Sequence, residues 1–246
     1  MLIKRITLKK ILSFNEATVE LGPLNVLIGP NAVGKSNLIE VIGLLQAAPS
    51  SLENAISRGG GVRQWLWLGD PVGARIAQTA CEVILGNGRF TGTVNYSLEL
   101  AEDATGFVVR HEQVSNNQLG SAKHGNYIDR RYGSAIYGSE AVKLMLPPAK
   151  ILLPSSFESV LSQFKNPADP TPMTELGRQF SRIRIFREFR TGPLSGARLG
   201  VSTSVSKEAL VDGGDNLALV LHELNFLGVH EKIRVICGVS ASASTT

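Results

Sequence analysis

The chain has 246 residues, of which 43% are apolar, with 25 Lys and Arg against 21 Asp and Glu. This apolar share excludes a disordered chain, and the length is enough to bury a core. The longest apolar stretch, Leu38–Pro49, is interrupted by Glu40 and Gln46 and is too short to span a bilayer. Cys81 and Cys237 lie far apart, which excludes a disulfide scaffold or a zinc module. The N-terminus has no signal-peptide pattern, so we expect a globular, cytoplasmic protein without membrane contact.

The first 50 residues predict strands followed by a helix. Apolar and polar side chains alternate around Ile6–Leu8 and again over Ala17–Leu21, which predicts two half-buried strands joined by a turn at Ser13–Glu16. Leu24–Ile28 is almost continuously apolar, as is typical of strands buried on both faces in α/β folds. From there the pattern becomes helical, and we expect a deeply packed helix over Ser36–Pro49.

The middle of the chain favours a β-meander, residues 76–113. A short helix over Leu52–Ser57 precedes it, before a glycine run at 59–61. Asn87-Gly88 predicts a hairpin turn between the first two strands. The predicted strands are Ile76–Leu85, Arg89–Leu100 and Gly106–Gln113.

Residues 115–182 are polar, rich in Gly and Pro, and predict a variable, partly helical excursion. A strand and a helix are expected over residues 183–227, and residues 240–246 predict a disordered tail. We interpret residues 1–239 as one domain. The elements expected after residue 115 are a hairpin around Asn126–Lys143, helices over Ser156–Gln163 and Pro172–Arg182, a strand over Ile183–Phe189, and a helix over Asn216–Phe226 capped by Asp215.

One motif carries chemistry: residues 29–36 fit G-x-x-x-x-G-K-[ST], the P-loop. Its glycines let backbone N–H groups converge on a phosphate, and the following helix presents its positive end to the same anion. Lys35 would reach the β- and γ-phosphates, and Ser36 would offer its hydroxyl to Mg²⁺. Nucleotide binding is therefore favoured over a plain glycine-rich turn. The expected site for ATP and Mg²⁺ consists of Gly29, Pro30, Asn31, Ala32, Val33, Gly34, Lys35, Ser36 and Asn37.

The N-terminal segments Ile3–Leu8, Ile11–Phe14, Val19–Leu21, Leu24–Asn31 and Gly34–Leu38 resemble a known family. They look like the N-terminal lobe of RecF/SMC-like ABC-type ATPases, most of all the bacterial AAA-family ATPases related to OLD nucleases and abortive-infection proteins. Further along, Phe186–Gly192 and Asp215–Ala218 are similar to segments of the same family. Val33 stands where the family has a small residue, and the motif leaves that position open.

The resemblance implies an α/β P-loop NTPase, an ABC-ATPase-like head in which ATP gates dimerisation or the engagement of a partner or DNA. By resemblance, the setting would be DNA repair or phage defence. Such heads use a Leu-Ser-Gly-Gly-Gln signature and a Walker B Asp-Glu pair that holds the magnesium-bound water. Leu194–Arg198 imitates the signature without its helix, and the chain has no Asp-Glu dipeptide. We therefore expect an incomplete head that binds ATP but hydrolyses it near background on its own, with a homodimer or a second subunit supplying both motifs.

Two further groups of residues have competing interpretations. Gln64 is a candidate for the glutamine that contacts the metal in such heads, in competition with Gln46, Gln78 and a plain surface role. Five arginines between residues 178 and 190 alternate with phenylalanines and could contact a DNA backbone. An amphipathic segment with Phe inward and Arg in solvent is favoured for that region.

Two other functions remain open at this stage. A P-loop small-molecule kinase needs an arginine-bearing lid soon after the P-loop helix, where the sequence instead predicts strands. A non-catalytic, truncated binding module is supported by the missing Asp-Glu pair.

Overall fold

The computed structural model describes residues 2–69, 76–86, 90–104, 106–116, 125–137, 149–153, 155–165, 171–187, 192–193, 195, 198, 207 and 209–227. The chain divides into two compact units, Met1–Ile183 and Arg184–Thr246. The first unit contains the P-loop motif. The predicted tail at 240–246 lies outside the described residues.

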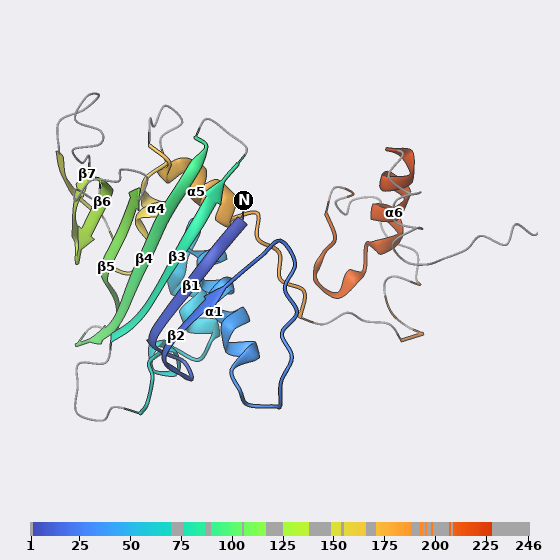
Figure 1. The fold of residues 1–246 in the computed structure, drawn as a ribbon, viewed down its shortest axis with the longest axis horizontal. Coiled ribbons are helices and arrows are strands. Elements are labelled where there is room, and N and C mark those ends of the chain that lie inside the picture. The colour runs from blue at the N-terminus through green and yellow to red at the C-terminus, as the bar shows by residue number, and fades with distance from the viewer. Residues whose placement is uncertain are drawn as a thin grey trace, which may run out of the picture. The chain divides into compact units, whose positions relative to one another are not determined.

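An eight-stranded sheet, antiparallel throughout, forms the first unit (Figure 1). The spatial order is β2-β1-β3-β4-β5-β6-β7-β8, so only the β1–β3 pair joins strands that are not consecutive in the chain. The strands are β1 Leu2–Ile11, β2 Phe14–Glu20, β3 Ile76–Leu85, β4 Gly92–Asp103, β5 Gly106–Asn116, β6 Gly125–Arg131, β7 Ser134–Tyr137 and β8 Ala149–Leu152. The expected meander is confirmed. Within the described part of 115–182, strands β6 to β8 extend the same sheet, and two helices follow them as the expectation of a partly helical region implies.

The helices of this unit lie on one face of the sheet, and Figure 1 shows α1, α4 and α5 on the same side of it. Strand β3 shows how the sequence selects that face, because every second side chain, from Ala77 to Leu85, is buried. On the opposite face, Arg5 and Glu82 form a surface ion pair. The helices are α1 Lys35–Ala47, α2 Leu52–Arg58, α3 Val62–Trp65, α4 Val160–Gln163 and α5 Met173–Phe180.

Helix α1 follows the P-loop. It buries Leu38, Val41, Leu44 and Leu45, and Ile42 packs partly buried against the same core. Residues 40–49 are all at least partly buried, so the expected deeply packed helix is confirmed over most of its length. The exposed positions, Ser36 and Ile39 at 39%, lie near its start.

The predicted strand over Leu24–Ile28 is wrong. These residues have no regular secondary structure, and Leu24, Val26 and Ile28 are 85%, 73% and 89% exposed. The Asn25 side chain closes a turn with Gly22, since its Oδ1 accepts from the Gly22 N–H and its Nδ2 donates to the Gly22 carbonyl, both at 2.9 Å. An apolar run becomes a central strand only where neighbouring strands bond its backbone, and within the described residues no strand pairs with this one.

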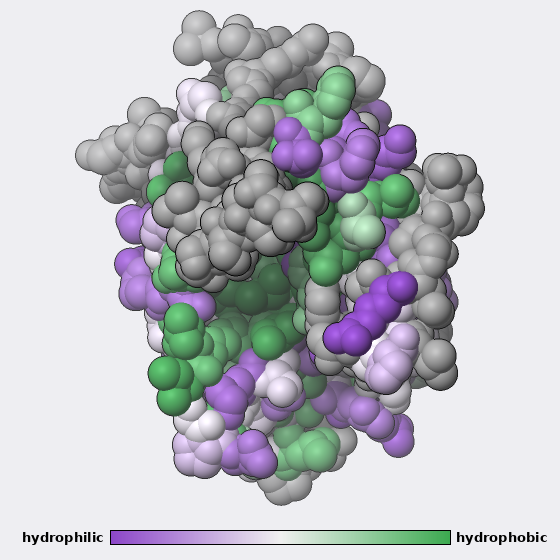
Figure 2. Space-filling view, turned by 90° about the vertical axis from the view of Figure 1, so that its right-hand side faces the viewer, coloured by the Kyte–Doolittle hydropathy of each residue, from purple (hydrophilic) through white to green (hydrophobic). Residues whose placement is uncertain are grey.

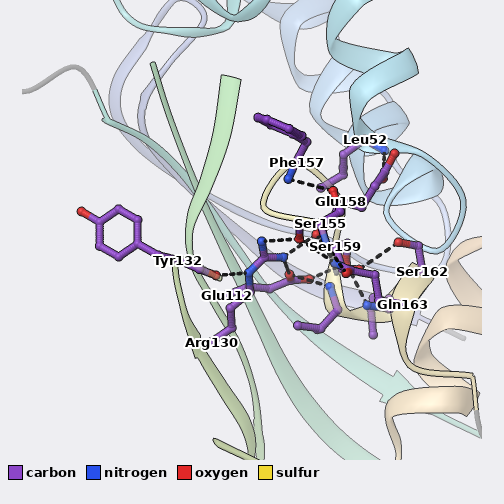
Figure 3. Close-up of polar contacts among 12 residues, drawn as sticks. Leu52, Glu112, Arg130, Tyr132, Ser155, Phe157, Glu158, Ser159, Ser162 and Gln163 are labelled. Carbon is purple, nitrogen blue, oxygen red and sulfur yellow. Dashed lines mark hydrogen bonds and ion pairs between the residues drawn. The ribbon is translucent and has the colours of Figure 1, made fainter. Parts of the chain in front are cut away.

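A buried polar network fastens residues 155–163, which we call the strap, to the sheet (Figure 3). The Glu112 carboxylate on β5 accepts hydrogen bonds from Tyr96 Oη at 2.8 Å and the Val160 N–H at 2.8 Å, and a further one from Ser159 Oγ. Arg130 on β6 lies 3.6 Å from the same carboxylate and donates to the Ser155 carbonyl at 3.1 Å. The network therefore supplies partners for a buried acid and a buried base that would otherwise be costly.

The strap also holds α2. Glu158 accepts from Ser51 Oγ and from the Leu52 N–H, both at 2.7 Å, at the start of that helix. Because Ser155 to Ser159 make these connections, helix α4 begins only at Val160, later than the predicted Ser156. The sheet, the strap and α2 are thus linked by one set of hydrogen bonds.

Beyond the sheet, a second prediction also fails. Residues 183–187 have no regular secondary structure where a strand over Ile183–Phe189 was expected, and residues 188 and 189 lie outside the described part of the chain. In the second unit, a short 3₁₀ turn at Asp212–Gly214 precedes α6, Leu217–Phe226, which confirms the predicted helix. The predicted cap is wrong, because Asn216 and not Asp215 is the N-cap residue, and its side chain makes no capping hydrogen bond. No helix among the described residues has the length and apolar character needed to cross a membrane.

Candidate phosphate-binding site

The P-loop backbone turns sharply into α1. Ala32 and Gly34 both have positive φ angles, 68° and 95°, so the chain visits the left-handed region twice within three residues. Gly34 is the residue that caps α1, and its carbonyl accepts the first helical hydrogen bond, from the Leu38 N–H at 3.0 Å. No side chain caps the first turn of α1, which leaves its N–H groups directed outward, as an anion site requires.

Lys35 is folded over the loop that precedes it. Its Nζ donates to the carbonyl of Gly29 at 2.7 Å and to that of Pro30 at 2.5 Å. The ammonium group is therefore held at the mouth of the loop, next to the first turn of α1. A positive charge at this point suits a phosphate group bound to the N–H groups of the same turn.

Val33 and Ser36 occupy the outer side of the loop, where both are exposed. A Cβ atom built on Gly29 would lie 3.3 Å from Val33 Cγ2, so the valine spans the loop and packs against its first glycine. This contact shows how the loop accommodates a residue larger than the family pattern. Ser36, in the first turn of α1, is accessible to a metal ion.

The turn between β1 and β2 packs against the P-loop. Asn37 Nδ2 donates to Ser13 Oγ at 2.8 Å. A Cβ atom on Gly34 would lie 3.0 Å from Phe14 Cζ and 3.1 Å from Ser13 Oγ, so both side chains touch the glycine directly. Sequence reasoning assigned Ser13 and Phe14 no role. The only signal was their place in the Ile11–Phe14 segment that resembles the family.

The other candidate residues make contacts elsewhere in the chain. Gln64 is exposed on α3 and packs on Gly60, where a Cβ atom would come within 2.4 Å of its amide carbon. In α5, Phe180 is buried and Arg178 pairs with Glu175 at 2.6 Å, which matches the favoured amphipathic interpretation for this part of the arginine series. Ser195 belongs to the Leu194–Arg198 segment that imitates the signature. Its N–H donates to the Gly192 carbonyl at 3.0 Å, a hydrogen bond that closes a turn.

Comparison with known proteins supports the resemblance over the N-terminal part of the chain. Residues 24–113 match the family described as "AAA domain, putative AbiEii toxin, Type IV TA system". The DNA replication and repair protein RecF of Magnetococcus marinus is 47% identical over 51 residues. Those residues are 20% of this chain and 13% of RecF, so the chain covers a small part of that relative's length.

A solved structure from work on ATP-driven dimerization and DNA stimulated activation of SMC ATPases also matches. The match covers 46% of this chain and 67% of that one, at 16% identity and a TM-score of 0.34. The P-loop lies inside the matched AAA region, and the mixed α/β class expected from the sequence is confirmed. Residues 24–113, with the P-loop among them, are thus similar to the AAA-domain family, and a stretch of 51 residues is similar to RecF.

Proposed function

We propose that this chain binds ATP together with Mg²⁺ at Gly29–Asn37. The observation that carries the proposal is the position of Lys35, whose ammonium group is held over the Gly29 and Pro30 carbonyls beside the uncapped start of α1. A backbone that turns twice through the left-handed region, a fixed cation and outward N–H groups form a combination suited to a polyphosphate.

Each residue has a separate task in this proposal. The N–H groups of the loop and the first turn of α1 hold the phosphate oxygens, and Lys35 shifts from the loop carbonyls to the β- and γ-phosphates. Ser36 offers its hydroxyl to Mg²⁺, which neutralises charge on those oxygens. The residues present therefore fit the cofactor. Gln64 is a weaker candidate for the same metal.

Hydrolysis by this chain alone is expected to stay near background. The sequence has no Asp-Glu dipeptide of the kind that holds the magnesium-bound water and activates the attacking one. Positioning and electrostatic stabilisation account for nearly all of phosphoryl-transfer catalysis, and a P-loop provides only part of them. Binding without turnover is the expected state.

We also propose that ATP gates assembly with a second copy or another subunit. This is supported by the exposed run Leu24–Ile28, which enters the P-loop directly and has apolar side chains in solvent. The space-filling view of one face shows apolar residues beside hydrophilic ones (Figure 2). A partner that bonds this segment would cover it and would at the same time lie beside the nucleotide.

DNA is a second proposed partner, through the similarity to RecF, a DNA replication and repair protein. A defence role follows in the same way from the toxin description of the matching family. A kinase is disfavoured, because residues 76–113 form strands β3 to β5 where such an enzyme would need an acceptor pocket and an arginine-bearing lid.

Calorimetry with ATP·Mg²⁺ on the wild type and on Lys35→Ala tests the proposal, with phosphate release followed in parallel. We expect binding by the wild type, at least tenfold weaker binding by the variant, and release near background in both. Failure of the wild type to bind would refute nucleotide binding. Turnover that disappears in Lys35→Ala would refute the expectation of an incomplete head.

Assembly is measured by light scattering after size exclusion, with and without ATP·Mg²⁺. A nucleotide-dependent rise in mass that Lys35→Ala lacks would support gating. An unchanged mass with bound ATP would exclude a homodimer gated by nucleotide and leave another subunit as the partner to seek.

A further inference from the structure

The β1–β2 turn is fixed to the rest of the sheet unit by backbone hydrogen bonds to residues 65–67. Leu12 N–H donates to the Trp65 carbonyl at 2.8 Å, and Trp67 N–H donates to the Lys10 carbonyl at 3.0 Å. Ile11 forms a bridge to Leu66 as well as pairing with Phe14 across the turn. The turn is therefore held in place by backbone hydrogen bonds with residues 65–67, far along the chain from it.

The turn also contacts the beginning of α1. The ring of Phe14 and the hydroxyl of Ser13 both lie against Gly34, as their 3.0 to 3.1 Å approach to a Cβ at that position shows. One turn further on, Asn37 donates to the Ser13 hydroxyl at 2.8 Å. Two side chains of one fixed turn thus contact the P-loop glycine and the first turn of α1 at separate points.

From this geometry we infer that Ser13 and Phe14 are positioning residues for phosphate binding. They hold Gly34 in its left-handed conformation and fix the direction of the N–H groups at Lys35, Ser36 and Asn37. Neither side chain needs to touch the nucleotide. The inference rests on the proposed function, because it concerns how the same site is kept ready.

The physical reason is preorganisation. The P-loop itself is mostly exposed, so its own packing does little to restrict it. When a loop becomes ordered only as the ligand binds, the free energy of ordering it weakens the affinity. Ser13 and Phe14, which we call the brace, order the loop beforehand and so remove this loss. Gly34 is where the brace acts, because the chain passes there from the loop into the helix.

The test uses inorganic tripolyphosphate as the ligand, since it reports on phosphate binding without the nucleoside. For the full chain, Phe14→Leu and Ser13→Ala should each weaken tripolyphosphate binding about five- to tenfold. Ser13→Thr keeps the hydroxyl and should retain most of the affinity. Amide exchange of Leu38, whose N–H bonds to the Gly34 carbonyl, should be faster in the two weakened variants without ligand.

Two variants on the same hairpin serve as controls. Val19→Ala removes a partly buried side chain of β2 that pairs with Ile6, and Thr18→Ala removes a hydroxyl that lies 3.4 Å from that of Thr7. Both should leave tripolyphosphate affinity and Leu38 exchange as in the wild type, although Val19→Ala lowers the melting temperature. A double-mutant cycle between Ser13→Ala and Asn37→Ala should show that their effects on affinity are not additive.

The outcomes separate the two proposals. Equal affinity and equal Leu38 exchange in wild type, Phe14→Leu and Ser13→Ala would overturn the brace and leave nucleotide binding intact. Weaker affinity in Val19→Ala as large as in Phe14→Leu would also overturn it, since general loosening would then explain the loss. A wild type that binds neither tripolyphosphate nor ATP would overturn the proposed function and the brace's part in phosphate binding with it.

Discussion

At Gly34, two independent conditions disfavour a side chain. The backbone has a φ of 95°, a conformation that costs an L-residue about 1 to 2 kcal/mol. The Phe14 ring also occupies the space that a Cβ would need. The sequence motif requires this glycine, but only the structure shows that Phe14 of strand β2 packs against it.

Gly34→Ala should therefore destabilise the protein more than strain alone would. We expect the free energy of unfolding to fall by about 2 to 4 kcal/mol, from the backbone conformation together with the clash against Phe14. Urea denaturation measures the change. Gly34→Ala in a Phe14→Ala background is the matched control, because it keeps the backbone conformation of residue 34 and removes the ring that approaches its Cβ position. There the substitution should cost about 1 to 2 kcal/mol. Equal losses in the two backgrounds would show that Phe14 does not crowd Gly34.

Among the elements, the strap shows how a short helix can depend on one buried acid. Burial raises the pKa of Glu112 above its ordinary value, and the hydrogen bonds from Ser159, Val160 and Tyr96 and the charge of Arg130 partly oppose this rise. The folded protein therefore binds the Glu112 proton more tightly than the unfolded chain. Its contribution to the free energy of unfolding is full below the ordinary glutamate pKa and decreases as pH rises toward the folded pKa.

Glu112→Gln tests that sign. The glutamine oxygen can still accept from Tyr96 and Ser159, but its NH₂ group faces the Val160 N–H, which loses its acceptor. The variant should therefore be less stable by about 1 to 3 kcal/mol at acidic pH. Glutamine does not titrate. The difference in the free energy of unfolding between the wild type and the variant should therefore decrease as pH rises from below the ordinary glutamate pKa. Urea denaturation across that range measures it, with the exposed Glu16→Gln as control. If that difference in the free energy of unfolding increased with pH, the folded state would favour the charged carboxylate.

The sequence pattern predicted some strands correctly because the strands with which they pair are adjacent in the chain. Strand β3 has the predicted bounds Ile76–Leu85, since its alternation and its hairpin to β4 lie in one stretch of chain. Leu24–Ile28 has an equally strong apolar pattern, but whether such a run becomes a strand depends on strands elsewhere. The packing of Phe14 on Gly34 likewise depends on tertiary contact, which no pattern of spacing contains. The P-loop could thus be predicted from the sequence, whereas its brace could not.

For the molecule as a whole, the exposed run before the P-loop bears on its behaviour in solution. Several adjacent apolar side chains in solvent favour self-association, whereas single exposed residues do not. Leu24, Val26 and Ile28 are all more than 70% exposed within five residues of chain. Concentration-dependent association is expected of the protein without its partner.

Val26→Asp should reduce that association without loss of stability, because Val26 is in solvent and a charge there repels a second copy. Sedimentation velocity over a range of concentrations measures it, and the melting temperature should stay within about 2 °C. Leu68→Asp is the control, since Leu68 is 68% exposed on a turn and should have little effect. Equal behaviour of both variants would place the associating surface elsewhere.

The strand order has a consequence for folding kinetics. Strands β3 to β7 pair with their neighbours in the chain, whereas β1 reaches β3 only after residues 21–75, with the P-loop among them, have been closed into a loop. Closing a long loop costs entropy before its contacts form, so we expect the meander to form first and β1 to dock late. The phosphate site would then be completed after the main barrier. Bound ATP would slow unfolding and leave the folding rate almost unchanged, which stopped-flow chevrons with and without the nucleotide would reveal.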